Sequence, residues 1–235
     1  MTQNVLALDA LCCGYGQATI IRDLSLAIKR GEAIALLGKN GMGKSTLLKG
    51  IMGFLPRQAG SVAFEGTLLP ERQPHMLAAR GVAYAPQEKA VFQDLSVEEN
   101  LRIAVPERRR LRDGLERIAE YFPFIAQRLR QKAGTLSGGE QKMLILGRAL
   151  MAQPRLLLVD EITEGLQPSV IERISGVLRA ERHASNIAML IVEQNVAFAL
   201  QTADRFAVLE RGELGAQGRT DEPGAQARII RELGI

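Results

Sequence analysis

The sequence contains no tryptophan, and aromatic residues make up only 4% of its 235 residues. Few side chains can therefore stack on bases, which argues against a protein that binds single-stranded nucleic acid. Long hydrophobic runs are also missing. The longest stretch without a charged residue, Ala10–Ile21, holds twelve residues, whereas a membrane-spanning helix needs about 20 apolar residues. We therefore expect no membrane span in this chain.

Cysteine is almost absent, since Cys12 and Cys13 are the only two and they are adjacent. An ordinary disulfide between neighbours is disfavoured by its geometry, so the pair fits a reducing compartment. The two are predicted to be small buried or half-buried residues of a strand. The first four residues lack a basic cluster followed by an apolar segment, so no secretory signal is predicted.

Charge is placed unevenly along the chain, although the net charge is only +4. Residues 102–132 hold nine basic and four acidic side chains and are alone +5. Such a segment is typical of contact with nucleic acid, of an anionic membrane surface or of a solvated helix face. The apolar content of 46% is close to the globular average. A chain of this size therefore buries a core in one or two domains.

Hydrophobic patterning predicts an α/β fold. Unbroken apolar runs at 156–159 and 187–192, separated by a predicted helix over 168–181, indicate parallel strands covered on both faces. The pattern turns helical over 96–129, where Ser96 opens a capping box, and again over 137–150. Shorter β-rich runs bounded by turn residues lie at 5–11, 20–28, 33–37, 61–64, 82–85 and 205–209. We expect an antiparallel β portion near the N-terminus and a short terminal helix.

A phosphate-binding loop is predicted at residues 38–46, which read G-K-N-G-M-G-K-S-T and match G-x-x-x-x-G-K-[ST]. The loop follows the apolar run 33–37 and opens a helix predicted over 45–52. Backbone N–H groups of such a loop surround phosphate oxygens, and the helix directs its positive end at them. Lys44 would meet the β- and γ-phosphates, and the Ser45 hydroxyl would coordinate Mg²⁺. The nucleotide-binding residues predicted here are Gly38, Asn40, Gly41, Gly43, Lys44, Ser45 and Thr46.

Two acids, Asp160 and Glu161, end the apolar run 156–159. In a doubly wound sheet, ligands bind at the carboxyl ends of the strands. Asp160 is therefore predicted to hold the Mg²⁺ shell and Glu161 to polarise the attacking water. Two acids after a strand can also form a helix N-cap, but the phosphate loop favours the catalytic interpretation.

The segment Leu136-Ser137-Gly138-Gly139-Glu140-Gln141 resembles the signature motif of ABC-type ATPases. Residues 84–87 (Y-A-P-Q) resemble the Q-loop of that family, and Tyr15 resembles its adenine-stacking aromatic residue. The resemblance covers essentially the whole chain, with the motifs in family order. It implies a single ABC ATPase domain over 1–235 with a phosphate-loop α/β core. That core comprises 1–87 and 151–235, and an α-helical subdomain over 88–150 carries the signature.

The family resemblance implies ATP and Mg²⁺ as cofactors, with two ATPs held between two ATPase subunits that are either identical or related. Ser137, Gly138, Gly139 and Glu140 would then act in trans on the partner's nucleotide. Gln87 would contact Mg²⁺ or the attacking water and transmit movement to the helical insert; Ser45 and Asp160 would complete the metal site.

The resemblance also implies partners in a membrane. Two transmembrane permease subunits would hold the chain at the cytoplasmic face of the plasma membrane, and an extracytoplasmic solute-binding protein would act indirectly. The +5 segment would face the anionic inner leaflet, and no nucleic acid is expected as a partner.

Two positions depart from the usual family pattern. Ile162 follows Glu161 where most members have proline, and Gln194 stands where most have a switch histidine. Residues 192–195 (V-E-Q-N) resemble the ATPases of branched-chain amino-acid and urea importers, as do residues 96–101 and 165–168. Residues 163–168 resemble more closely the members of that branch that serve urea or short amides. Gln194 is predicted to act in catalysis as a γ-phosphate contact, the alternative being a cap on its strand.

The predicted function is therefore the ATP-hydrolysing subunit of an importer for branched-chain amino acids, urea or related small polar solutes. The ATPase of a lipid or lipopolysaccharide exporter is the main alternative. A soluble ABC ATPase acting on nucleic acid or ribosomes is less favoured, because such proteins have tandem domains or long insertions. A nucleotide binder that never hydrolyses conflicts with Glu161.

Overall fold

The computed structural model describes residues 4–87, 90–105 and 107–235, without the side chains of residues 108 and 109. The first two residues of the predicted helical subdomain, 88 and 89, lie outside this part of the chain. So do residues 1–3 of the N-terminal segment for which no signal is predicted.

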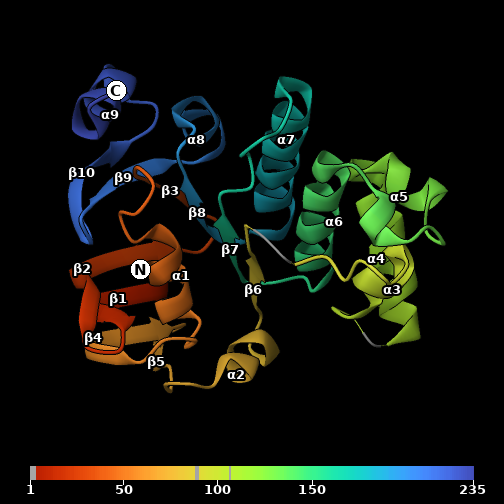
Figure 1. Cartoon of the computed structure of the whole chain (residues 1–235), viewed down its shortest axis with the longest axis horizontal. Coiled ribbons are helices and arrows are strands. Elements are labelled where there is room, and N and C mark those ends of the chain that lie inside the picture. The colour runs from red at the N-terminus through yellow and green to blue at the C-terminus, as the bar shows by residue number, and fades with distance from the viewer. Residues whose placement is uncertain (1–3, 88–89, 106) are drawn as a thin grey trace.

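A six-stranded sheet in the order β10-β9-β3-β8-β7-β6 forms the centre of the molecule (Figure 1). Five of its strands run parallel, and only β10 at one edge pairs antiparallel. Strands β3, β7 and β8 are buried along their whole length, which explains their unbroken apolar runs. The strands are β3 (Ala33–Leu37), β6 (Val82–Ala85), β7 (Leu156–Asp160), β8 (Ala188–Glu193), β9 (Arg205–Glu210) and β10 (Glu213–Arg219).

A second, antiparallel sheet in the order β2-β1-β4-β5 comes from the N-terminal part of the chain, as predicted. It shares one buried cluster with helix α1 and with one face of β3, so α1 is packed between the two sheets. Cys12 is half-buried and Cys13 buried on β1, and both are free, which confirms their prediction. The elements are β1 (Asn4–Tyr15), β2 (Ala18–Lys29), α1 (Lys44–Ile51), β4 (Arg57–Phe64) and β5 (Thr67–Leu68).

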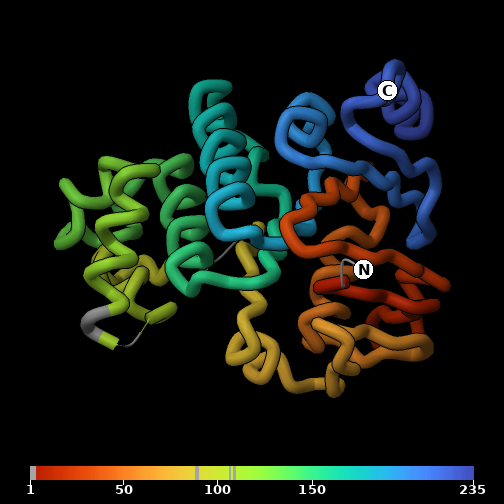
Figure 2. The backbone as a smooth tube through the Cα atoms, turned by 180° about the vertical axis from the view of Figure 1, so that it is seen from behind, coloured from red at the N-terminus to blue at the C-terminus, as the bar shows by residue number. Residues whose placement is uncertain are grey.

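Helices cover the other face of the central sheet and extend beyond one end of it. Helices α6, α7 and α8 share the main hydrophobic cluster with β3, β7 and β8. Figure 2 shows α3 to α6 gathered at the end of the molecule away from the antiparallel sheet. The helices are α2 (Pro74–Ala79), α3 (Val97–Arg102), α4 (Arg108–Tyr121), α5 (Pro123–Gln127), α6 (Gly138–Met151), α7 (Pro168–Ser185), α8 (Val196–Thr202) and α9 (Ala225–Leu233).

A buried ion pair joins this helical group to the core. Arg117 of α4 donates two hydrogen bonds, of 2.9 and 3.0 Å, to the carboxylate of Glu181 on α7, and a third of 2.7 Å to the carbonyl oxygen of Leu150. A buried carboxylate that keeps its charge needs such a partner. Part of the basic segment 102–132 therefore has a structural role. No helix in the described part of the chain is long and apolar enough to cross a bilayer.

Candidate nucleotide site

The predicted phosphate loop connects β3 to α1 at the carboxyl end of the central sheet. Gly43 lies in the left-handed region with φ 101°, where a larger residue is strained. At Gly38, a Cβ atom would lie 2.7 Å from the carbonyl oxygen of Leu209. These two glycines are therefore required by the local backbone, in addition to any contact with phosphate.

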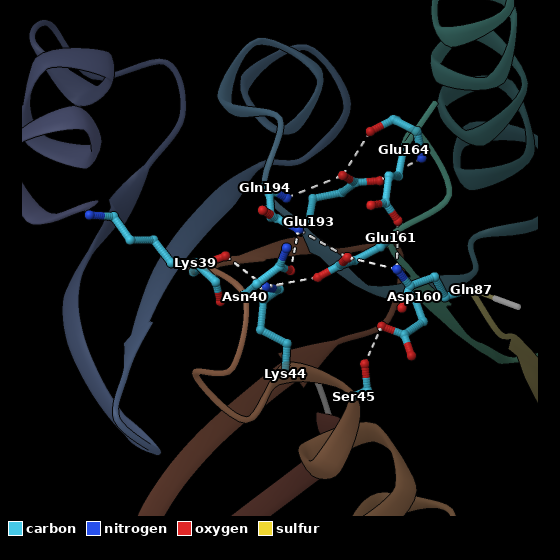
Figure 3. A network of polar contacts seen from close by, with 12 residues as sticks. Lys39, Asn40, Lys44, Ser45, Gln87, Asp160, Glu161, Glu164, Glu193 and Gln194 are labelled. Atoms are coloured by element: carbon cyan, nitrogen blue, oxygen red, sulfur yellow. Dashed lines mark hydrogen bonds and ion pairs between the residues drawn. The ribbon is translucent and has the colours of Figure 1, made fainter. Parts of the chain in front are cut away.

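Lys44, the first residue of α1, is 4% exposed, and its ammonium group is held at the mouth of the loop (Figure 3). Its Nζ donates hydrogen bonds of 2.7 and 2.9 Å to the carbonyl oxygens of Gly38 and Lys39. It also forms an ion pair of 2.8 Å with Oε1 of Glu161. The cation that is predicted to bind phosphate and the carboxylate that is predicted to act as base are therefore direct neighbours.

Asp160 ends β7 beside the first turn of α1. Its Oδ1 accepts a 3.1 Å hydrogen bond from Ser45 Oγ, and its Oδ2 accepts one of 2.9 Å from the Tyr84 hydroxyl. Burial raises the pKa of Asp160, and the hydrogen bonds from Tyr84 and Ser45 lower it. Ser45 and Asp160 thus place a hydroxyl and a carboxylate oxygen together, the hard donors that Mg²⁺ prefers.

Tyr84 belongs to this site, although the sequence predicted no role for it beyond its place in the 84–87 motif. It lies on β6, the strand beside β7, and burial together with the adjacent Asp160 raises the pKa of its hydroxyl. The hydroxyl therefore stays protonated and donates to Asp160. Its position near the carboxyl end of a parallel strand was the available signal.

Glu161 has a left-handed backbone with φ 42°, which costs a non-glycine residue about 1–3 kcal/mol. Its amide donates a 2.9 Å hydrogen bond to the carbonyl oxygen of Val192 on the next strand. Its Oε2 accepts hydrogen bonds of 3.0 Å from both Gln87 Nε2 and Gln194 Nε2. Three predicted site residues, Lys44, Gln87 and Gln194, therefore meet on one carboxylate.

Two further side chains, for which the sequence predicted no role, contact residues around Glu161. Glu164 accepts a 2.6 Å hydrogen bond from Gln87 Nε2. Lys142 of α6 donates to the carbonyl oxygens of Glu161 and Glu164, at 3.3 and 2.6 Å. The helix that begins at the signature motif thus contacts the segment that follows the predicted base. The only feature of the sequence that could have predicted this contact was the position of Lys142, one turn into that helix.

Gln194, the residue after β8, turns its side chain toward the phosphate loop. Besides its contact with Glu161, Nε2 donates a 2.7 Å hydrogen bond to Oδ1 of Asn40 (Figure 3). The amide therefore bridges the loop and the carboxylate and does not cap its own strand.

A cavity of about 350 Å³ lies beside these groups, within the size range of small-molecule sites. Tyr15, half-exposed at the end of β1, forms part of its wall, and its hydroxyl accepts a 3.4 Å hydrogen bond from Lys49. An aromatic ring and a phosphate loop thus border one cavity. It is lined by Tyr15, Ile20, Asn40, Gly41, Gly43, Lys44, Ser45, Thr46, Gln87 and Glu161.

The signature residues lie elsewhere, at the start of α6. Ser137 caps this helix in a capping box, in which its hydroxyl accepts from the amide of Glu140 and the Glu140 carboxylate accepts from the amide of Ser137. Ser137 and Gly138 are exposed. None of the described residues that line the cavity belongs to the signature. This helix N-terminus therefore lies outside the cavity of its own chain.

Known proteins share sequence similarity with this chain over most of its length. The family model described as ABC transporter matches residues 21–164. The chain is 38% identical to the high-affinity branched-chain amino acid transport ATP-binding protein BraG of Pseudomonas aeruginosa, over 89% of this chain and 91% of BraG. It is 36% identical to the probable branched-chain amino acid transport ATP-binding protein LivF of Archaeoglobus fulgidus, covering 90% and 91%. The lipopolysaccharide export system ATP-binding protein LptB of Escherichia coli is 33% identical, covering 90% and 89%.

The fold is likewise shared with solved structures. The ADP conformation of MJ1267, an ATP-binding cassette of an ABC transporter, superposes with a TM-score of 0.85 at 26% identity, covering 99% of this chain and 96% of that one. The predicted phosphate-loop α/β fold of ABC type is thereby confirmed. The chain belongs to the ABC transporter family, and it is a nucleotide-binding ATPase coupled to transport.

Proposed function

We propose that this chain hydrolyses MgATP to power an importer of branched-chain amino acids or related small polar solutes. The main support for ATP hydrolysis is that the Glu161 carboxylate contacts Lys44, Gln87 and Gln194 at one wall of the cavity. BraG and LivF, both named as branched-chain amino acid transport proteins, support the solute class. Urea as the solute has less support, since neither of these two names mentions it. An exporter function also has less support, because LptB is the more distant relative at 33% identity.

Each side chain of the site has its own role in the proposed hydrolysis. When bound beside Ser45 and Asp160, Mg²⁺ supplies positive charge to the β- and γ-phosphates. Lys44 exchanges its ion pair with Glu161 for the γ-phosphate, which frees the carboxylate to orient a water and accept its proton. Gln194 donates its amide to the γ-phosphate, and Gln87 keeps Glu161 aligned. The ring of Tyr15 stacks on the adenine.

A second ATPase subunit, identical or related, is proposed to complete each site. The exposed start of α6 offers backbone N–H groups and a positive helix end, which favour an anion. Because the signature residues do not line the cavity of their own chain, we assign Ser137, Gly138 and Gly139 to the γ-phosphate of the partner's ATP. Glu140 holds Ser137 in place through the capping box.

A groove of about 340 Å³ between Gln87 and α6 is the proposed contact with a permease. Phe92, which is 52% exposed, lies in the segment that borders it. Gln87 and Lys142 both line the groove and both contact the segment of Glu161 and Glu164, so a helix seated there moves the catalytic loop. Two permease subunits would hold the ATPase pair at the cytoplasmic face of the membrane, and a solute-binding protein would act through them.

Solute uptake tests this function. With its permease subunits in liposomes, solute-binding protein outside and MgATP inside, the chain is expected to drive accumulation of labelled leucine. The Lys44→Ala variant, which lacks the phosphate cation, is the matched control and should give none. Uptake of urea in place of leucine would move the solute to the urea class, and extraction of lipopolysaccharide without uptake would support the exporter.

Replacing Gln194 by alanine is expected to lower kcat for ATP about tenfold to a hundredfold, with the ATP affinity nearly unchanged. Loss of one hydrogen bond to the γ-phosphate is worth about 1–3 kcal/mol, and a contact that strengthens in the transition state affects kcat. Steady-state ATPase kinetics of the assembled transporter measure this change in kcat. Gln201→Ala, an exposed glutamine of the following helix α8, is the control. A wild-type kcat for Gln194→Ala would remove this residue from the mechanism.

A further inference from the structure

Glu193, the last residue of β8, is a carboxylate buried to 2% exposure directly beside the nucleotide site. Its Oε1 accepts a 3.0 Å hydrogen bond from the amide of Thr163, and its Oε2 accepts one of 2.8 Å from the Thr163 hydroxyl. Oε2 also accepts a 3.2 Å hydrogen bond from the amide of Gln194. Burial raises the pKa of Glu193, whereas hydrogen bonds from Thr163, Gln194 and Asn195 lower it.

The partners of Glu193 belong to the segments that form the reacting side of the site. Thr163 comes two residues after Glu161, and Gln194 is the residue whose side chain touches both Glu161 and Asn40. The backbone of Glu193 reaches the phosphate loop as well, since its carbonyl oxygen accepts a 3.4 Å hydrogen bond from Gly38. Glu193 thus connects the end of its own strand to two segments that are distant in the sequence.

A carboxylate suits this position because Thr163 and Gln194 both present donors to it. An ionised glutamate only accepts, with about four lone-pair positions. A glutamine of the same shape would turn an NH₂ group toward one of those donors and leave it unpaired inside the protein. Alanine would leave all of them unpaired. The identity of the residue therefore matters beyond its volume.

The hydrogen bonds of Glu193 control where two predicted catalytic groups lie. The amide of Gln194 is fixed by Oε2, which sets the direction in which its side chain leaves the strand. Glu161 stands in a strained left-handed conformation with φ 42°, and the turn that follows it is held by the bonds to Thr163. Both segments are thus bonded to the same carboxylate.

We propose that Glu193 is a positioning residue for hydrolysis. It fixes the positions of Gln194 and Glu161 relative to each other, so that both side chains reach the γ-phosphate region together. In this role it acts through those two residues and takes no part in the chemical step itself. This inference rests on the proposed ATP hydrolysis and on the role of Gln194 in it.

Kinetics of Glu193→Gln in the assembled transporter test the proposal. We expect kcat to fall about tenfold while KM for ATP changes less than about twofold, because the ground-state phosphate contacts of the loop remain. Thr163→Val removes only the hydroxyl donor and keeps the amide bond, so it should reduce kcat less. This second variant keeps the test decisive where Glu193→Gln does not fold.

A double-mutant cycle separates positioning from general stability. If Glu193 acts through Gln194, the Glu193→Gln/Gln194→Ala variant should turn over no more than about twofold slower than the slower single variant, since coupled residues are not additive. Ser175→Ala is the matched control. It removes a buried 2.9 Å hydrogen bond to Thr202 between α7 and α8, and it should lower Tm without lowering kcat.

The proposal would be overturned by multiplying losses in the double variant, or by a rise in KM that accounts for the whole effect. It would also be overturned if Ser175→Ala, at a similar loss of Tm, lowered kcat as much as Glu193→Gln does. An unaltered kcat in Glu193→Gln beside a lowered kcat in Gln194→Ala would overturn it and leave the proposed function intact. Wild-type protein that hydrolyses no ATP in the assembled transporter would instead contradict the proposed function.

Discussion

Glu161→Gln is expected to lower kcat for ATP hydrolysis by about 10²- to 10⁴-fold, the range that a general base contributes. The amide keeps the shape of the side chain and loses the basic oxygen that would accept the proton of the attacking water. It also removes a negative charge 2.8 Å from the Lys44 ammonium, so Lys44 is left for phosphate. We therefore expect ATP to bind at least as tightly as in the wild type.

A stalled nucleotide should also hold the two ATPase subunits together. Gel filtration of Glu161→Gln with MgATP is expected to show a dimer that ADP does not maintain. Glu164→Gln is the matched control, because this exposed carboxylate also accepts a hydrogen bond from Gln87 but, within the described part of the chain, forms no ion pair with Lys44. Full turnover by Glu161→Gln, with the loss appearing in Glu164→Gln, would move the base to Glu164.

Lys44→Ala is expected to weaken nucleotide binding by about a hundredfold or more. Charge-assisted hydrogen bonds to phosphate are the strong ones, and losing one partner of a desolvated charge pair costs about 2–5 kcal/mol. The variant also leaves the nearly buried Glu161 without its ammonium partner, which by itself destabilises the fold. Isothermal titration with ATP and thermal unfolding measure the two effects.

Two further variants keep these effects apart. Lys44→Ala/Glu161→Gln removes the unpaired carboxylate, so it should regain thermal stability without regaining ATP affinity. Lys39→Ala is the matched control, since the side chain of this loop lysine runs away from the cluster to the carbonyl oxygen of Gly234 (Figure 3). Wild-type affinity in Lys44→Ala, or an equal loss in Lys39→Ala, would contradict the assignment of Lys44 to phosphate.

The elements that the sequence predicted best are those with a strong local signal. The runs at 33–37 and 82–85 are the strands β3 and β6 with the same bounds. The capping box predicted at Ser96 begins α3, and the helix predicted over 137–150 is α6. The helical pattern over 96–129 is divided into three helices, and Pro123 starts the last of them because proline is tolerated only in the first turn.

Two short helices escaped prediction, and each has a local reason. Helix α8 begins only two residues after β8, so in the sequence its apolar residues are hard to distinguish from the apolar run of that strand. Helix α2 has six residues, too few to show a helical period. Elements this short are fixed by packing against the rest of the fold more than by their own sequence.

The sequence by itself determined the chemistry that is contiguous in the chain: the phosphate loop with Lys44 and Ser45, the acids after β7, and a signature at a helix start. Only the tertiary structure decided which groups meet. Gln87 and Gln194 reach Glu161 from 74 and 33 residues away. The hydrogen-bond partners of Tyr84 and Glu193 could not be predicted from the spacing of residues in the sequence. The physical reason is that parallel strands end at one edge of the sheet, so residues after different strands converge there whatever their distance along the chain.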